Sequence, residues 1–593
     1  MGIVAGFRRL IGLFNKKEKT NSVIMLGLII LGGLAETIGI GVILPFATIL
    51  LDQTSVEKYP IIKTITEVPW IGGYRRFIAI LCVGLVLIFI LKSLYMFFLI
   101  YIQNRFTLNR QIDMSRKLFQ SYIYKPYEYF FHKNTAELQR NVNVLVGSVI
   151  QGMLMTGLSL LTELMVVVCI MVLLLIIDPI SSVSIIIVLG GITALYYIFV
   201  KKKLNSIAKK QQTYGIGMVK SVNEGLGGIK DVKILQREES FISRYNENGR
   251  GFAKTTATYN IISQSPRLLI ETVAICGLLI IVVINALRNP DMGASLPTIA
   301  LFGMAAIRIM PSMNRIVGYM TTVRFSTTHF EMIYDDLKEA GSGSTRRYEE
   351  VKKTEFTKNI EIHGLKYRYP GTESVVLENV ELTIDKGLSI GIMGSSGAGK
   401  TTLIDLLLGL LEPEKGEILI DGKNIMDNLE GYRKNIGYVP QEICIIDDRI
   451  AANVAFGVPE DDVDLDKVWA VLRTANLADY IETLEDGLDT KVGESGMRLS
   501  GGQRQRLGIA RALYDDPDIL VLDEATSSLD TESEKAISDA MINVGHAKTM
   551  IIIAHRLNTL DKCDAIYEII DSRIEIADIR MKAADQDTKA GES

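Results

Sequence analysis

The chain has 593 residues, too many for one hydrophobic core, so we expect at least two domains. Hydrophobic residues make up 48% and charged residues 22%, and the mean hydropathy of +0.24 predicts a membrane part joined to a water-exposed part. The net charge of −4, without a strongly basic block, argues against nucleic acid as a partner. Five scattered cysteines with no CxxC pair argue against a disulfide framework or a zinc site.

Six apolar runs in the first part of the chain are each long enough to cross a membrane, which takes about 20 helical residues. The runs cover residues 23–51, 77–102, 144–177, 179–200, 268–287 and 296–320. The stretch 1–20 before them is basic and lacks a small-residue cleavage site, so we expect it to be retained and to lie in the cytoplasm. An even number of crossings then returns the chain to the cytoplasm.

The connections between these runs differ in character. Segments 103–143 and 201–267 are long and charged yet compatible with helix, so we expect them to extend the membrane helices into the cytoplasm. Asp178-Pro179 predicts a tight outer turn. In the outer loop 52–76, apolar residues are spaced as on one face of a short helix. This loop is either a helix lying flat on the membrane or a cover over the helix ends.

A change of composition separates the membrane part from a second domain. Ala340–Arg347 (AGSGSTRR) is small, flexible and polar, and from Thr357 onward short strand-like runs lead into alternating strand and helix patterns. This alternation is typical of an α/β domain. We therefore expect an α-helical membrane domain over 1–339, a linker over 340–356, and an α/β domain with a short C-terminal tail over 357–593.

The sequence GSSGAGKTT fits the phosphate-loop pattern G-x-x-x-x-G-K-[ST], between a strand-like run and a helical apolar pattern. Its glycines let backbone N–H groups point into one anion-sized hollow, to which the following helix adds its positive N-terminal end. Lys400 is expected to reach the β- and γ-phosphates of ATP, and Thr401 to offer its hydroxyl to Mg²⁺. The residues expected to line the nucleotide site here are Gly394, Ser395, Ser396, Gly397, Ala398, Gly399, Lys400, Thr401 and Thr402.

An apolar run ending in two acids follows at Asp518–Glu524 (DILVLDE). Four consecutive apolar residues are typical of a parallel strand buried on both faces, and ligands bind at the carboxyl ends of such strands. We expect Asp523 to join the Mg²⁺ shell and Glu524 to be the base that polarises the attacking water. A solvated turn would explain an acidic pair alone, but not its combination with a phosphate loop.

A second phosphate site is predicted at LSGGQ, where a long helical pattern begins. Ser500 is a favourable N-cap, and Gly501 and Gly502, followed by Gln503, allow an anion to approach the helix end closely. One chain has no evident use for two phosphate sites on a single ATP. Two chains do, if each presents this helix to the nucleotide bound by the other.

With these motifs in this order, residues 357–570 resemble the nucleotide-binding domain of ABC transporters. The resemblance implies that Glu524 is the catalytic glutamate, that His555 is the switch histidine, and that Gln441 serves both catalysis and Mg²⁺ binding. It also implies that Tyr369 stacks on adenine and that Asp530 lies at the nucleotide.

Six membrane runs before one such domain resemble the half-transporter layout of the type IV exporter fold. This resemblance implies an ABC exporter fold in which two copies form a homodimer with two active ATP sites. Spans four and five are then expected to cross over and pack with the partner. Coupling helices are expected near Tyr127–Leu138 and Glu224–Leu235.

The membrane part further resembles the bacterial flippases that move lipid-linked oligosaccharides for N-glycosylation. The matching stretches are Glu36-Thr37 and Pro45-Phe46 in the first span, Pro266-Arg267 at the fifth, and RIMPSMNR, Arg308–Arg315, in the sixth. The resemblance implies a lipid-linked glycan as cargo.

Four cations in or near the spans independently support an anionic cargo. An arginine at mid-span costs about 3 kcal/mol to insert, and Arg308 and Arg315 lie two helical turns apart on one face. Cations facing one cavity suit a pyrophosphate. Alternatively, each snorkels from a helix end or pairs with a carboxylate such as Glu36, Glu163 or Glu271. The four are Lys92, Arg267, Arg308 and Arg315.

The sequence thus predicts an ATP hydrolase coupled to transport, a translocase of the bacterial inner membrane that uses ATP and Mg²⁺. As cargo we expect a polyprenyl-pyrophosphate-linked oligosaccharide, flipped from the cytoplasmic to the outer leaflet. The nearest alternative is an exporter of another lipid, a drug or a peptide on the same fold. A remote alternative is a non-transport ABC ATPase of DNA repair or translation, against which the six spans argue.

Overall fold

The computed structural model describes residues 3–42, 74–131, 133–177, 179–272, 292–342, 351–523, 548–554 and 563–577, with a few single positions between these ranges. The chain forms two compact units. Unit 1 comprises Met1–Lys125 and His132–Ser344, and unit 2 comprises Pro126–Phe131 and Thr345–Ser593. The short segment Pro126–Phe131 therefore belongs with the C-terminal domain, although helices of unit 1 flank it in sequence.

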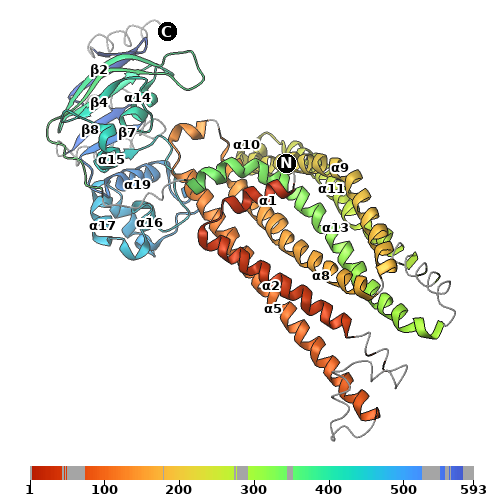
Figure 1. Ribbon diagram of the computed structural model, residues 1–593. Coiled ribbons are helices and arrows are strands. Elements are labelled where there is room, and N and C mark those ends of the chain that lie inside the picture. Colours follow the sequence, from red (N-terminus) through yellow and green to blue (C-terminus); the bar gives the residue numbers. More distant parts are fainter. Residues whose placement is uncertain are drawn as a thin grey trace. The chain divides into compact units, whose positions relative to one another are not determined.

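Unit 1 is built of helices, several of them longer than a membrane is thick (Figure 1). Its described helices are α1 (Ile3–Gly12), α2 (Lys16–Gly41), α5 (Tyr74–Ile123), α6 (Thr135–Arg140), η3 (Asn141–Leu145), α7 (Val146–Val149), η4 (Ile150–Met155), α8 (Thr156–Ile177), α9 (Pro179–Gly227), α10 (Ile229–Ile234), α11 (Glu238–Gln264) and α13 (Met292–Ser342). α5 has 50 residues, about 75 Å at 1.5 Å per residue. The predicted helical extensions are confirmed, because α5 and α9 run well past membrane length and α11 continues in segment 201–267.

Three helices within the described residues are long and apolar enough to cross a membrane: Lys16–Gly39, Arg76–Ile123 and Thr135–Ile177. They contain most of the first three predicted runs. The fourth and sixth runs lie in helices α9 and α13. Most of the outer loop and of the fifth run, together with Asp178, lie outside the described residues.

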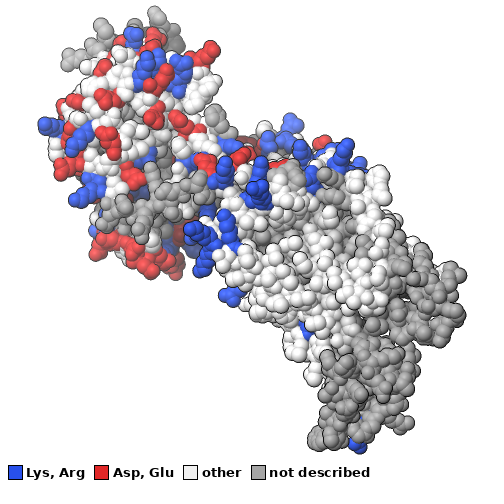
Figure 2. All heavy atoms as spheres, in the orientation of Figure 1, with Lys and Arg blue, Asp and Glu red and all other residues white. Residues whose placement is uncertain are grey.

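Helix α8 runs alongside both α2 and α13 (Figure 1). Val166, Ile170 and Leu174 recur every four residues, so they share one face of α8, and this face is buried against Ile309 and Met313 of α13. Apolar residues on another face of α8 are exposed, as is typical of a helix in contact with lipid. Figure 2 shows the long helices as a mostly uncharged band, with Lys and Arg gathered at the end where α1 lies.

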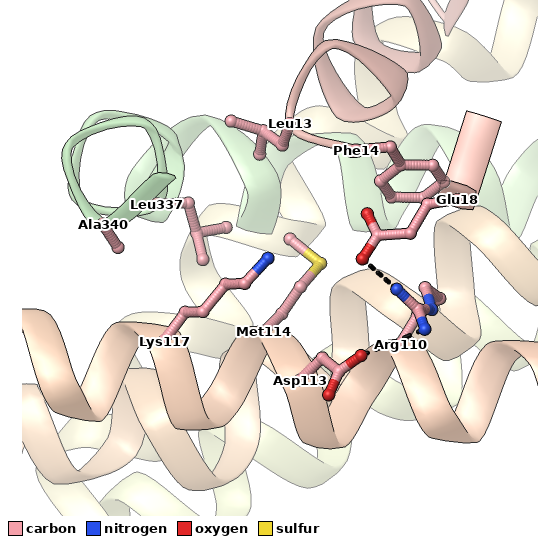
Figure 3. A pocket seen from close by; sticks show the side chains of 9 residues that line it. All are labelled: Leu13, Phe14, Glu18, Arg110, Asp113, Met114, Lys117, Leu337 and Ala340. Atoms are coloured by element: carbon pink, nitrogen blue, oxygen red, sulfur yellow. Dashed lines mark hydrogen bonds and ion pairs between the residues drawn. The ribbon is translucent and has the colours of Figure 1, made fainter. Parts of the chain in front are cut away.

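A polar anchor ties the α1–α2 junction to α5 (Figure 3). The Arg110 guanidinium pairs with Glu18 and, at 3.0 Å, with Asp113. Glu18 also accepts the backbone N–H of Asn15 at 2.8 Å, just before α2 begins. The hollow beside these groups has a volume of about 20 Å³, room for one water molecule. Because Arg110 already has two carboxylate partners, we assign no ligand to this hollow.

Unit 2 contains two sheets. Among the described residues, one is antiparallel in the order β2-β1-β4-β5, and the other has the order β10-β9-β3-β8-β7-β6, in which β9, β3, β8, β7 and β6 are parallel. The strands are β1 (Asn359–Tyr367), β2 (Leu377–Asp385), β3 (Ser389–Gly394), β4 (Lys415–Ile420), β5 (Lys423–Asn424), β6 (Ile436–Val439), β7 (Ile519–Asp523), β8 (Thr549–Ile553), β9 (Ala565–Ile570) and β10 (Arg573–Ile576). The described helices are η2 (Tyr127–Phe131), α14 (Lys400–Leu407), η5 (Ile425–Asn428), α15 (Leu429–Arg433), α16 (Ile450–Val454), η6 (Glu460–Asp462), α17 (Leu465–Thr474), α18 (Ala478–Glu482), η7 (Gly487–Asp489), η8 (Glu494–Gly496) and α19 (Gly501–Leu513).

The parallel sheet brings the predicted motifs to one edge. β7 lies between β6 and β8, parallel to both, and all five of its residues are buried, which confirms the prediction for the run before the acidic pair. β3 leads into the predicted phosphate loop, and α14 begins at Lys400. The carboxyl ends of β3 and β7 therefore open at the same edge of the sheet, where ligands bind in such folds.

Candidate nucleotide-binding site and intramembrane charges

The loop between β3 and α14 has the backbone shape that a phosphate site needs. Gly397 and Gly399 have φ angles of +81° and +103°, a region that favours glycine. A Cβ atom at Gly399 would lie 3.1 Å from Cγ1 of Val376, so a side chain there would be crowded as well as strained. Because α14 begins at Lys400, the unpaired N–H groups of its first turn point toward this loop.

The ammonium group of Lys400 lies inside this loop. Its Nζ donates to the backbone carbonyls of Gly394 and Ser395, both at 3.0 Å, and the side chain is buried. Both of these acceptors are neutral. The positive charge of Lys400 is therefore placed to attract an anion entering the loop.

Oxygen groups suited to a divalent cation are found at the same edge. Asp523 is buried at the end of β7, and the Tyr438 hydroxyl donates to its Oδ2 at 3.5 Å. Thr401 is exposed at the start of α14, and Gln441 is exposed shortly after β6. Carboxylate, hydroxyl and amide oxygens are hard ligands of the kind that Mg²⁺ prefers, so this set fits a nucleotide-bound magnesium ion.

Asp405 is a buried acid of α14 that the sequence analysis did not single out. Burial and the nearby Asp523 carboxylate raise the pKa of Asp405 to about 6. Its helix neighbours Ile404 and Leu406 are buried too. An acid inside an apolar helical run was the signal that the sequence offered.

Tyr369 lies directly beside the phosphate loop. Its hydroxyl is 3.0 Å from Oγ1 of Thr402, and its ring meets the ring of Tyr367 edge to face at a centroid distance of 5.2 Å. The ring centroids of Phe131 and Tyr369 are 5.6 Å apart, and the two ring planes make an angle of 66°. Sequence analysis found Tyr369 but not Phe131, because 238 positions separate the two in the chain.

The predicted second phosphate site has the expected helix start. Ser500 is the N-cap of α19, its side chain accepts from the Gln503 backbone N–H at 3.2 Å, and its own N–H donates to Oε1 of Gln503 at 2.8 Å. This reciprocal capping box confirms Ser500 as the N-cap. Gly501 begins the helix and Gly502 is buried in its first turn. Glu524, Asp530 and His555 lie outside the described residues.

Two of the predicted intramembrane cations have carboxylate partners. Nζ of Lys92, on α5, lies 3.0 Å from Oε1 of Glu36 on α2. Arg315 of α13 donates twice to Glu163 of α8, from Nε to Oε1 at 2.7 Å and from Nη2 to Oε2 at 3.2 Å. These ion pairs are the ones that the alternative interpretation of the cations names.

The other two predicted cations are Arg267 and Arg308. Arg267 is exposed just beyond the end of α11. Arg308 lies within α13, but its side chain falls outside the described part of the structure. The structure therefore brings Lys92 and Arg315 together with acids and does not gather the four cations around one described cavity.

Together with the apolar helices of unit 1, the phosphate loop and the acidic strand end define the class of this protein, a membrane transporter driven by ATP. The sequence family described as ABC transporter matches residues 377–527, and the family described as ABC transporter transmembrane region matches residues 22–284. The second match excludes a non-transport ABC ATPase.

Full-length relatives and a solved structure agree with this class. The chain is 30% identical to the ATP-dependent lipid A-core flippase of Burkholderia orbicola (strain AU 1054), over 79% of this chain and 77% of that protein. It is 28% identical to the protein of the same name from Shewanella oneidensis, over 96% and 94%. A bacterial Atm1-family ABC exporter solved with ATP bound has the same fold, with a TM-score of 0.77, 20% identity and 97% of each chain covered.

The chain belongs to the ABC transporter family. It has the ABC exporter fold, binds ATP and couples ATP hydrolysis to transport, as a multi-pass membrane protein whose ATPase domain lies in the cytoplasm.

Proposed function

We propose that this transporter is a homodimeric flippase of the bacterial inner membrane that moves a polyprenyl-pyrophosphate-linked oligosaccharide from the cytoplasmic to the outer leaflet. The observation that carries the proposal is the exposure of the Arg315 side chain, which stays 39% exposed although its guanidinium is paired with Glu163 as the alternative interpretation expected. Relatives named lipid flippases support a lipid cargo.

The exposed guanidinium gives the membrane domain a contact for phosphate. Arginine has five N–H donors, and Glu163 receives two of them in this pair, so others are left to bind an anionic headgroup. The Glu163 side chain is only 13% exposed, so its carboxylate would fix the position of the Arg315 guanidinium until an anionic headgroup competes for it. Lys92 makes a single contact with Glu36, at 3.0 Å, and would supply a second cation.

The ATP site supplies the energy in this proposal. When bound, ATP with Mg²⁺ provides a phosphoanhydride whose hydrolysis releases free energy. Lys400 and the loop glycines would bind and orient the phosphates, and Thr401, Gln441 and Asp523 would hold the metal ion. Glu524 would take the proton of the attacking water, with His555 and Asp530 beside it. Tyr369 would orient the adenine ring.

The second phosphate site is the reason for proposing a homodimer. α19 begins with exposed Ser500 and with its N–H groups ordered by the capping box. In the proposed dimer these groups would contact the γ-phosphate held by the partner chain, so that ATP clamps the two domains together. Coupling segments at η2 and α10 would pass this closure to the membrane helices.

A second candidate cargo is a different anionic lipid. The relatives named lipid A-core flippases favour it, and phosphate chemistry alone does not separate the two. Liposomes containing the purified protein distinguish them, with flipping measured for a polyprenyl-pyrophosphate oligosaccharide, lipid A-core and a neutral glycolipid. The proposal predicts ATP-dependent flipping of the first. Flipping of lipid A-core alone would favour the second candidate, and equal flipping of the neutral lipid would contradict an anionic cargo.

A further inference from the structure

The segment Tyr127–Phe131 is held in unit 2 by two different contacts. The Phe131 ring packs against Tyr369 at 5.6 Å, and the Tyr127 ring packs edge to face on Phe131 at 5.1 Å. Glu128 adds a polar contact, since its Oε1 accepts from the Tyr367 hydroxyl at 3.2 Å. The segment therefore contacts Tyr367 at the end of the strand β1 and Tyr369, two residues further on.

Tyr369 joins this segment to the phosphate loop. Its hydroxyl bonds Oγ1 of Thr402, which is buried two residues after Lys400. Tyr367 supports the Tyr369 ring from another side. The Tyr369 side chain contacts Phe131, Tyr367 and Thr402 together. A bound base that shifts the Tyr369 ring therefore also changes the contact between Tyr369 and Phe131.

We propose that Phe131 is a positioning residue for the nucleobase and acts through its ring contact with Tyr369. In this proposal the binding of adenine, and not only that of the phosphates, stabilises the position of the segment Tyr127–Phe131. The proposal rests on the proposed stacking role of Tyr369. An edge-to-face ring contact of this kind changes an equilibrium about two- to ten-fold. Because coupling between the two contacts of Tyr369 is reciprocal, loss of Phe131 weakens the binding of adenine nucleotides by the coupling factor, which is at most the strength of the ring contact.

Two nucleotide probes separate the base from the phosphates. The purified full-length protein is given Mg²⁺ with either adenylyl imidodiphosphate or inorganic tripolyphosphate. The affinity for each is measured, together with amide hydrogen exchange of residues 126–135. We expect the adenine analogue to slow exchange in this segment several-fold more than tripolyphosphate does. Equal protection by the two probes would overturn the proposal.

Phe131→Ala is the decisive variant, and Phe130→Ala is its matched control. Phe130 lies in the same segment but packs on Tyr129, at 5.6 Å. Phe131→Ala should bind the adenine analogue about two- to ten-fold more weakly, bind tripolyphosphate unchanged, and lose the adenine-specific protection. Phe130→Ala should keep both. If Phe131→Ala does not fold, Phe131→Leu removes the ring while keeping apolar volume. The same changes in binding and in protection are then expected for Phe131→Leu.

Tyr369→Ala distinguishes the stacking role of Tyr369 from the positioning role of Phe131. If it weakens binding of the adenine analogue while Phe131→Ala does not, Tyr369 stacks on the base and the positioning role of Phe131 is refuted. If Tyr369→Ala leaves the preference for the adenine analogue unchanged, the stacking role itself fails, and with it this proposal.

Discussion

Asp405 shows how one buried side chain sets a pH dependence. Its pKa of about 6 in the folded protein lies above the ordinary value of 3.8, because the carboxyl is buried near Asp523. Between about pH 4 and pH 6 the unfolded chain loses this proton while the folded chain keeps it, so the stability that Asp405 contributes falls as pH rises through this window and then levels off. A displacement of this size corresponds to about 3 kcal/mol.

We therefore expect Asp405→Asn to remove this fall. In EDTA, which keeps divalent ions from Asp523, the melting temperature of the wild type should fall relative to that of Asp405→Asn between about pH 4 and pH 6. Asp462→Asn, which changes an exposed acid, should follow the wild type. Parallel profiles for Asp405→Asn and the wild type would show that Asp405 is not buried as described.

Variants of Arg315 and Glu163 distinguish a role of this ion pair in transport from a role in stability alone. If Arg315 binds cargo phosphate, Arg315→Ala loses a charge-assisted contact of about 1.5–3 kcal/mol and flips lipid-linked glycan at least several-fold more slowly, with little effect on basal ATP hydrolysis. Arg308→Ala should act likewise, and the double variant should be worse. Glu163→Gln, which frees Arg315 from a charged competitor, should bind the anionic lipid more tightly.

The control is the melting temperature in the same lipid. If the ion pair is structural only, Arg315→Ala and Glu163→Gln both lower the melting temperature and leave the flipping rate per folded protein unchanged. Normal flipping by both Arg308→Ala and Arg315→Ala would remove the support for an anionic cargo.

The sequence predicted residues whose roles depend on local spacing. Lys400 and Ser500 were found because a phosphate loop and a helix cap are built from neighbours in the chain. The partner of Arg315 was left among several carboxylates, because Glu163 is 152 positions away and only packing of α8 on α13 selects it. Asp405 was missed for the same reason, since its environment depends on the distant strand β7.

At the scale of elements, α19 carries a prediction about its exposed N-terminus. Ser500→Arg places a long cation where the partner's γ-phosphate would lie, so we expect ATP hydrolysis to be lost while nucleotide binding at the phosphate loop persists. Ser500→Ala removes the cap at a cost of about 1 kcal/mol to the helix without blocking its end, so it should retain more activity. Full hydrolysis by Ser500→Arg would exclude a second phosphate site at this helix.

Most elements followed from periodicity, and the exceptions have physical causes. The runs before the phosphate loop and the acidic pair became β3 and β7, and the charged extensions became helix, because apolar spacing specifies both. The third membrane helix was not foreseen in detail, since it contains two π-helical stretches, Asn141–Leu145 and Ile150–Met155. Such widened turns depend on tertiary packing and leave no mark on hydrophobic periodicity.

At the scale of the whole molecule, the proposed homodimer predicts complementation between two inactive chains. Lys400→Ala disables the phosphate loop and Ser500→Arg disables the helix that the other chain uses. In a mixed dimer, the loop of the Ser500→Arg chain meets the intact helix of the Lys400→Ala chain, so one complete site forms. We expect co-expression to restore partial ATP hydrolysis, although each variant alone is inactive.

The controls for complementation use the same two variants. A mixture of separately purified proteins that do not exchange chains should stay inactive. A chain that carries both substitutions should also be co-expressed with each single variant. Neither combination forms a complete site, so we expect no ATP hydrolysis above the background from contaminating wild type. Absence of activity in verified mixed dimers would contradict sites shared between chains.

The most direct test of the account is ATP-driven flipping of a fluorescent polyprenyl-pyrophosphate oligosaccharide in liposomes, with wild type compared with Glu524→Gln. The account predicts that the wild type flips this lipid only with ATP and Mg²⁺. Glu524→Gln should bind ATP yet flip almost none, since a neutral amide does not take the proton of the attacking water. Flipping by Glu524→Gln at the wild-type rate, or flipping by the wild type without ATP, would contradict it.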